Sequence, residues 1–321
     1  MTDCAILLCD PVCAIFNASV QQGNCPSVWK IAAVIPIPKV HPPTSVQSDL
    51  RPISLTPTIS KQLEAIVGKW ILTHVRDQLD ARQYGSLKGR STTHALIDVF
   101  HHWNEALDNG KSVRALFIDY AKAFDHIDHS TVLKKLRNYG VPIFIINWLV
   151  SFLQERQQRV KIGDVLSGWV TLRGGVPQGS WLGPLIFLIL IDDLRPQLLT
   201  HKYMDDTTVS EIVEKDESSQ MQSVVDELVR WSASNHMNIN SRKTKEMILG
   251  RRCQQDMSPV MISGQVVEQV TSFNLLGVTV TDSLRWNDHI GAITAKASKR
   301  LWFVKKTQTS WCITVRSQLL L

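Results

Sequence analysis

Three carboxylates in this chain of 321 residues are placed where they could do chemistry. Asp119 ends an alternating apolar segment that predicts a strand, and Asp205-Asp206 forms the predicted turn between two further strands. If these strands are neighbours in one sheet, the carboxylates meet at one edge. Each feature has an ordinary alternative when taken alone, because a paired aspartate is typical of a solvated hairpin tip and a strand-end aspartate is typical of a cap.

Carboxylates that converge in this way raise one another's pKa unless a cation neutralises them. Mg²⁺ suits such a site, because it binds one or two carboxylates together with substrate phosphates. Two ions roughly 3.5–4 Å apart can stabilise the attacking and leaving oxygens of phosphoryl transfer without a side-chain nucleophile. The sequence contains no Gly-x-Ser-x-Gly, His-Glu-x-x-His or Gly-x-x-x-x-Gly-Lys-Ser/Thr motif that would favour another reaction.

Composition limits the possible classes of protein. A hydrophobic content of 44% with 20% charged residues excludes wholesale disorder. The net charge of +6 favours a polyanionic partner. Six irregularly spaced cysteines predict neither a disulfide scaffold nor a zinc site, and indicate a reduced, intracellular protein.

Neither a signal peptide nor a membrane span is expected. Residues 1–20 lack a basic region before their apolar residues and contain Asp3 and Asp10. The strongest apolar run, 182–191, is only ten residues long, whereas a helical span needs about 20. This run therefore predicts a buried helix.

Apolar periodicity predicts the elements around the carboxylates. A Pro-rich passage at 36–57 is expected to form extended segments and turns. The predicted helices, with Ser60 as the N-cap of the first, are 60–79, 130–139, 143–154, 182–191, 216–235 and 289–306. The predicted strands are 113–119, 158–162, 168–172, 200–204, 207–212, 244–249, 260–262 and 278–280.

Three blocks make the sequence resemble a known family. Residues 117–125 (FIDYAKAFD) resemble motif A of reverse transcriptases, 176–184 (VPQGSWLGP) resemble motif B, and 203–206 (YMDD) resemble motif C. The flanking blocks resemble those of non-LTR, LINE-type retrotransposons of a jockey-like branch, and they include 29–30, 35–39, 50–55, 83–85, 89–92, 240–245 and 275–278. The similarity covers the chain from about Cys9 to about Lys306.

The resemblance implies a role for each matching residue. Asp119 and Asp205 would hold two Mg²⁺ ions, with Mn²⁺ as a substitute, and Asp206 would assist. The backbone carbonyl of Tyr120 would be a further ligand. Lys243 would protonate the leaving pyrophosphate as a general acid, although a solvated lysine is an equal interpretation of that position.

The nucleotide would be contacted by residues on both sides of the carboxylates. Phe124 resembles the bulky residue that collides with a ribose 2′-hydroxyl, although a core aromatic would look the same. Gln178 and Gly179 would lie under the incoming nucleotide, and glycine permits the close approach this needs. Arg51 and Lys39 resemble the basic residues that grip the triphosphate.

The C-terminal part of the chain is expected to hold nucleic acid. Leu275, Leu276 and Gly277 fall in the block that resembles the primer grip. From residue 281 onward, seven basic residues outnumber two acidic ones, which accounts for +5 of the net charge. The basic residues expected to contact the nucleic-acid backbone are Lys296, Lys299, Arg300, Lys305 and Lys306.

The resemblance implies an α+β fold with a right-hand polymerase architecture, in which helices back an antiparallel palm sheet. The expected parts are an N-terminal extension leading into the fingers at 1–27, fingers at 28–112, a palm carrying motifs A to E at 113–280, and a partial, truncated helical thumb at 281–321. Part of 140–180 is expected to return to the fingers.

The function implied is RNA-directed DNA polymerase activity, which adds dNTPs to a primer 3′-hydroxyl on an RNA template. The alternative is a catalytically impaired or domesticated fragment that binds RNA or an RNA–DNA hybrid without polymerising. Nuclear residence follows from the resemblance alone. Full elements of this type also carry an endonuclease and a long C-terminal region, so this chain is expected to be an incomplete element.

Overall fold

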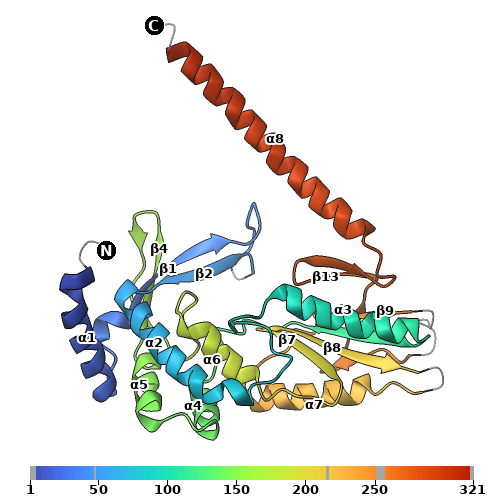
Figure 1. Ribbon diagram of the computed structural model, residues 1–321, viewed down its shortest axis with the longest axis horizontal. Coiled ribbons are helices and arrows are strands. Elements are labelled where there is room, and N and C mark those ends of the chain that lie inside the picture. Colours follow the sequence, from blue (N-terminus) through green and yellow to red (C-terminus); the bar gives the residue numbers. More distant parts are fainter. Residues whose placement is uncertain (1–4, 47, 215–216, 251–256, 319–321) are drawn as a thin grey trace.

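The computed structural model describes residues 5–46, 48–214, 217–250 and 257–318, and it has the mixed α+β character expected. Two sheets lie side by side, each covered by helices, and one long helix projects away from both (Figure 1). We call them the central sheet, which has the strand order β12-β9-β3-β8-β7, and the N-terminal sheet, which has the order β2-β1-β4-β5 with β6 paired to β4.

The central sheet is built on β3, which pairs antiparallel with β8 on one side and with β9 on the other. All seven residues of β3 are buried. The expected alternation is therefore an alternation between two buried faces and not between core and solvent. The strands of this sheet are β3 (Ser112–Ile118), β7 (Leu199–Tyr203), β8 (Asp206–Val213), β9 (Lys245–Leu249) and β12 (Glu268–Gln269).

Helices cover both faces of the central sheet (Figure 1). Val113, Ala115 and Phe117 pack with the buried face of α3 (Thr92–Asp108), a helix that the sequence analysis did not predict. Leu116 and Ile118 point to the opposite face, into the core that contains α6 and α7. The odd and even positions of β3 thus pack into separate cores, because strand side chains alternate with a period of two.

The N-terminal sheet forms from segments that are far apart in the chain. β1 pairs antiparallel with β2, so that Pro36 lies opposite Pro52, and it pairs parallel with β4. The Pro-rich passage is thus extended as expected, and residues after the central strand β3 return to this sheet. Its strands are β1 (Ile31–Pro38), β2 (Leu50–Leu55), β4 (Gln157–Ile162), β5 (Val165–Leu166) and β6 (Val170–Thr171).

The other elements surround the two sheets. The helices not yet given bounds are α1 (Ala5–Gln21), α2 (Thr58–Val75), α4 (His129–Asn138), α5 (Ile143–Leu153), α6 (Leu182–Ile191), α7 (Met221–Ser234) and α8 (Asn287–Gln318), with 3₁₀ turns η1 (Ser27–Trp29) and η2 (Arg76–Gln78). The short hairpins are β10 (Met261–Ile262) with β11 (Gln265–Val266), and β13 (Ser272–Leu275) with β14 (Val278–Thr281).

Several predicted boundaries were wrong, including both ends of the helix predicted at 289–306, which spans Asn287–Gln318. Ser60 is not an N-cap, because α2 already begins at Thr58 and the Ser60 hydroxyl donates to Glu64 (3.0 Å). The helix predicted from residue 216 begins at Met221, and Asp216 lies outside the described residues. The hairpin turn is one residue earlier than expected, because Asp206 already pairs with Tyr203 in the ladder of β7 and β8.

The apolar helix α6 is buried along almost its whole length, as its sequence predicted. Its N-terminus receives the buried Glu64 carboxylate of α2, which accepts from the Ser180 hydroxyl (2.6 Å) and the backbone N–H of Trp181 (2.8 Å) and Leu182 (3.3 Å). A carboxylate there satisfies N–H groups that lack intrahelical partners and complements the helix dipole. Over the described ranges, no helix combines the length and apolarity needed to cross a bilayer.

Replacing Glu64 with Ala should lower the free energy of unfolding by about 2–4 kcal/mol, because buried donors at the start of α6 lose their acceptor. Urea titration followed by circular dichroism measures this change. Glu105→Ala, on the exposed side of α3, is the matched control and should change stability by about 0.5 kcal/mol or less. Equal effects of the two substitutions would show that the Glu64 contacts do not stabilise α6.

Candidate active site

The pairing of β3 with β8 brings the predicted carboxylates to one end of the central sheet. The registered pairs Phe117–Thr208 and Ile118–Thr207 lead directly to Asp119 opposite Asp206, although 87 positions separate them in the chain. Asp205 lies in the turn beside Asp206. The convergence expected from the sequence is therefore present in the structure.

The turn itself is tightly constrained. Met204, its first residue, has a left-handed backbone with φ of 59°. A Cβ on Gly85 would lie 2.5 Å from the Met204 backbone nitrogen, so only glycine allows this approach. The segment around Gly85 therefore supports the turn that carries Asp205.

All three carboxyl groups have raised pKa values. For Asp119 the cause is burial, which the charges of Lys243 and Lys39 and a hydrogen bond from Asn240 oppose. Burial and the charge of Asp119 raise the pKa of Asp205. The pKa of Asp206 rises to about 6, because protein displaces part of its water and because Asp205 and Asp119 repel its negative charge.

The predicted basic residues act on these carboxylates from three different segments. Lys39 follows β1 and Lys243 precedes β9, and both lower the pKa of Asp119. Arg51 of β2 lowers the pKa of Asp205. All three side chains belong to exposed residues, so they remain accessible to an anionic ligand that approaches the carboxylates.

The donor set fits divalent cations with oxygen ligands. The backbone bonds next to Tyr120 join the Ala121 N–H to Asn238 (2.8 Å) and the Asn240 N–H to the Asp119 carbonyl (2.8 Å). These bonds flank the bridge between Tyr120 and Ile239 and do not use the Tyr120 carbonyl, which is thus compatible with the ligand role predicted for it. A bound cation would neutralise the negative charge of the three neighbouring carboxylates and remove their mutual repulsion.

A tighter group of potential metal ligands lies nearby, and it consists of Asp98, His102 and His201, whose ligand atoms are within 4.8 Å of one another. Asp98 accepts from the Tyr84 hydroxyl (2.7 Å) and bonds to His201 Nε2 (2.9 Å). Arg82 also lies 3.8 Å from the Asp98 carboxylate. These contacts already satisfy and neutralise the Asp98 carboxylate without a metal ion. We therefore interpret the cluster as a set of hydrogen bonds that joins α3 to β7.

Phe124 and Gln178 lie where motif A meets the start of α6. The Phe124 ring is half-buried and stacks on Phe187 of α6, with centroids 5.0 Å apart. Gln178 donates to Asp125 (3.0 Å). The next helix, α4, is capped by Asp128 and not by Asp125.

Gly179 lies close to the backbone of another protein segment, and its predicted approach to the nucleotide stays a prediction. Its φ is 134°, and a Cβ there would lie 2.4 Å from the Ser54 carbonyl oxygen of β2. The Ser54 N–H also donates to the Gln178 carbonyl (2.7 Å). Gln178 and Gly179 are therefore fixed against the N-terminal sheet.

The predicted primer-grip residues form the tip of the hairpin of β13 and β14. Leu276 and Gly277 have φ of 48° and 90°, as a tight two-residue turn requires. Leu275 and Leu276 line a small pocket together with Asp206. Leu275 and Leu276 therefore lie near Asp206, and their role at a primer stays a prediction.

The basic residues of α8 lie away from the carboxylates, on the helix that projects from the rest of the chain (Figure 1). They belong to exposed residues, and Lys306 Nζ lies 4.9 Å from the centre of the Trp302 ring. Such a surface suits a nucleic-acid backbone, because contacts of that kind need exposed cations and no enclosed pocket. Their role remains a prediction.

Two buried charged residues that bond the ends of α6 were missed from the sequence. Glu64 and Lys202 are charged, fully buried residues at opposite ends of α6. Nothing in the sequence around Lys202 distinguishes it from a solvated charge. A charged residue at an apolar position of the predicted helix 60–79 was the only available signal, and it applies to Glu64 alone.

Comparison with known proteins identifies relatives of the chain. Residues 37–280 match the family described as reverse transcriptase (RNA-dependent DNA polymerase). A probable RNA-directed DNA polymerase from transposon BS of Drosophila melanogaster is 27% identical over 92% of this chain and 34% of its own length. The RNA-directed DNA polymerase from the mobile element jockey of the same species is 28% identical over 95% of the chain and 34% of its own length.

The chain thus spans about a third of the length of these curated relatives. Among solved structures it is similar to telomerase of Candida albicans in complex with a fragment of telomeric RNA, with a TM-score of 0.55 and 13% identity over 84% of this chain and 48% of that one. Apo telomerase of Candida tropicalis truncated from its C-terminal domain gives a TM-score of 0.54, with 11% identity over 81% of this chain and 54% of that one. The expected right-hand polymerase fold is confirmed.

The raised pKa of Asp206 predicts how stability depends on pH. A protonated Asp206 stabilises the fold below its ordinary pKa of 3.8, and this contribution is lost as pH rises through about 6. In EDTA, Asp206→Asn should therefore gain stability over the wild type between pH 4 and 7, by about 1 kcal/mol once solvent screening of this exposed group is allowed for. Thermal or urea unfolding at each pH measures the difference.

The same series in Mn²⁺ provides the control. At pH 7.5 the ion should raise the Tm of the wild type more than that of Asp206→Asn, and the gain should shrink below pH 6. Asp226→Asn, an exposed carboxylate on α7, should follow the wild type throughout. A Tm gain in Mn²⁺ that is independent of pH and of Asp206 would contradict a cation site at these carboxylates.

Proposed function

This chain belongs to the reverse transcriptase (RNA-dependent DNA polymerase) family, and from that premise we propose that it polymerises DNA on an RNA template. Its proposed substrates are dNTPs and a primer with a free 3′-hydroxyl. The observation that carries the proposal is the meeting of Asp119, Asp205 and Asp206 at one end of the central sheet, with raised pKa values.

The proposed metal site consists of Asp119, Asp205, the assisting Asp206 and the Tyr120 carbonyl. Two Mg²⁺ ions, replaceable by Mn²⁺, would supply Lewis-acid stabilisation of the attacking and leaving oxygens when bound. Every other step depends on the chain's own side chains, which orient the nucleotide and neutralise its charge. Catalysis of this kind relies on positioning and electrostatics and needs no covalent intermediate.

Arg51 and Lys39 are proposed to bind the triphosphate, because both approach the carboxylates from the N-terminal sheet. Lys243 is close enough to Asp119 to influence its pKa, which supports a role in donating a proton to the leaving pyrophosphate. Phe124 is proposed to block a ribose 2′-hydroxyl, and Gln178 and Gly179 to support the nucleotide and template from the start of α6.

The proposed domain limits follow the sequence analysis. The proposal assigns 28–112 and part of 140–180 to the fingers, and 113–280 to the palm. The pairing of β1 with β4 supports the return of part of 140–180 to the fingers, whereas α3 packs on the central sheet. Residues 1–27 would lead into the fingers, and 281–321 would belong to the thumb. The hairpin tip at Leu275, Leu276 and Gly277 would hold the primer, and the α8 cations would hold the duplex backbone. Residence in the nucleus is part of the proposal by analogy with the family alone.

Primer extension on an RNA template with Mg²⁺ or Mn²⁺ tests the proposal directly. Asp205→Asn should reduce incorporation roughly a thousandfold, because a metal ligand supplies several kcal/mol of transition-state stabilisation. Asp226→Asn removes an exposed carboxylate from α7 and should leave the rate unchanged. Wild-type protein that binds an RNA–DNA hybrid without extending the primer would favour the non-catalytic alternative.

Replacing Phe124 with Ala should admit ribonucleotides. Discrimination between dNTP and rNTP, measured as the ratio of kcat/KM values, should fall by about 10- to 100-fold, because one steric clash supplies that much selectivity. Phe124→Tyr keeps the ring stacked on Phe187 and should retain the preference. An unchanged sugar preference in Phe124→Ala would remove the gate assignment.

A further inference from the structure

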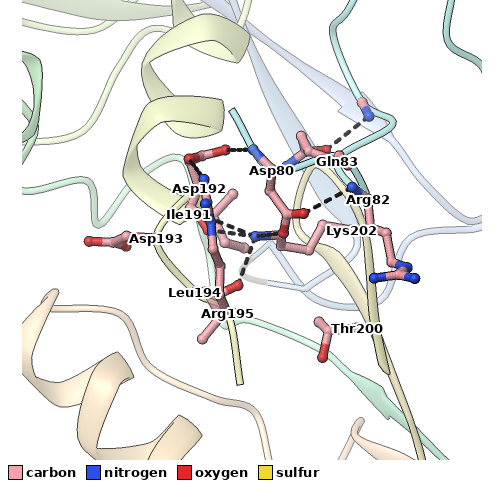
Figure 2. A network of polar contacts seen from close by, with 12 residues as sticks. Asp80, Arg82, Gln83, Ile191, Asp192, Asp193, Leu194, Arg195, Thr200 and Lys202 are labelled. Carbon is pink, nitrogen blue, oxygen red and sulfur yellow. Dashed lines mark hydrogen bonds and ion pairs between the residues drawn. The ribbon is translucent and has the colours of Figure 1, made fainter. Parts of the chain in front are cut away.

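Lys202 is a fully buried lysine in β7, three residues before Asp205. Its ammonium donates to the backbone carbonyls of Ile191 (3.3 Å), Asp192 (3.0 Å) and Leu194 (2.7 Å). Figure 2 shows the Nζ atom pointing into this ring of carbonyls, with the Asp80 carboxylate beside it. Asp80 lies 2.8 Å from Nζ and supplies the compensating charge.

These carbonyls belong to the end of α6 and the turn that follows it. The last carbonyls of a helix lack intrahelical partners, and the helix dipole favours a cation there. Burial lowers the pKa of Lys202, and the nearby Asp80 opposes that shift. The lysine thus bonds the end of α6 to β7, in a site where a lost contact could not be replaced by water.

The backbone of Lys202 is fixed as firmly as its side chain. Its N–H donates to the Arg82 carbonyl (2.9 Å), and its carbonyl accepts from the Tyr84 N–H (2.8 Å). The Gln83 side chain accepts from the Met204 N–H (3.4 Å) in the turn beyond. The segment 82–84 and the Lys202 side chain therefore hold β7 from two directions.

The other end of α6 carries the residues proposed to contact the nucleotide. Gln178 and Gly179 lie just before the helix, whose N-terminus is bonded to Glu64. A ten-residue helix is about 15 Å long and stiff. The distance from Gln178 to the Asp205 turn is thus set by this helix and by the bonds that join its far end to β7.

We propose that Lys202 is a positioning residue, which holds the Asp205 turn at a fixed place relative to α6 and so aligns the carboxylates with the nucleotide. The inference rests on the proposed function. It assigns Lys202 no contact with substrate or ion, and it predicts that losing the ammonium displaces the carboxylates more than it weakens nucleotide binding.

Lys135 offers a matched control within the same helix end. Its ammonium donates to the Leu190 carbonyl of α6 and lies 2.6 Å from Asp193, and the residue is also buried. It comes from α4 and has no bond to β7 among those described. Lys135→Met therefore removes a buried cation from the α6 C-terminus without releasing the strand that carries Asp205.

The experiment compares Lys202→Met with Lys135→Met at matched folded fractions. Lys202→Met should lower kcat for primer extension at least 30-fold with KM for dNTP changed less than threefold, and it should weaken Mn²⁺ binding, followed by the electron paramagnetic resonance of free Mn²⁺, at least fivefold. Lys135→Met should stay within threefold of the wild type in all three quantities. Equal effects of the two substitutions would overturn the proposal.

Lys202→Met leaves the Asp80 carboxylate without its buried partner and can fail to fold for that reason. The double variant Lys202→Met/Asp80→Asn removes both charges and should recover stability without recovering kcat or Mn²⁺ affinity. Recovery of either quantity would overturn the proposal. If wild-type protein extends no primer, the proposed function fails, and the Mn²⁺ titrations still decide whether Lys202 positions the carboxylates.

Discussion

The structure depends on antiparallel pairing between β3 and β8, which forces like charges together. That register brings Asp119 opposite Asp206, and the turn adds Asp205. Burial of all three carboxyl groups raises their pKa values, and repulsion raises those of Asp205 and Asp206 further, so their charged forms oppose folding. Both faces of β3 are buried against helices, and this apolar packing stabilises the strand register that the charged carboxylates oppose.

The surroundings of the carboxylates are held by buried polar contacts and not by the apolar core alone. α6 has an apolar surface that would pack in several rotations and axial positions. Glu64 at its start and Lys202 at its end have directional bonds that only one position satisfies. Because these bonds fix the position of α6, the helix can hold Gln178 and Gly179 at a constant distance from the Asp205 turn.

The sequence predicted the elements whose apolar periodicity is strong and the residues that lie inside short motifs. β3, α4, α5 and α6 were placed to within a residue or two, and Asp119, Asp205 and Asp206 meet as expected. α3 was missed, because its buried residues lie among histidines and other polar groups. The turn was predicted one residue too late, because aspartate favours turns and methionine does not. The left-handed backbone of Met204 could not be predicted from its residue type.

The parallel pairing of β1 with β4 has a consequence for how the chain folds. Ile31 and Gln157 are ladder partners, and the central strand β3 lies between them in the sequence. The N-terminal sheet therefore cannot be completed until α3 and β3 of the central sheet have been synthesised, and closing so long a loop is slow. The segments of the central sheet and the N-terminal sheet alternate along the chain, so we expect neither sheet to fold as an independently expressed fragment.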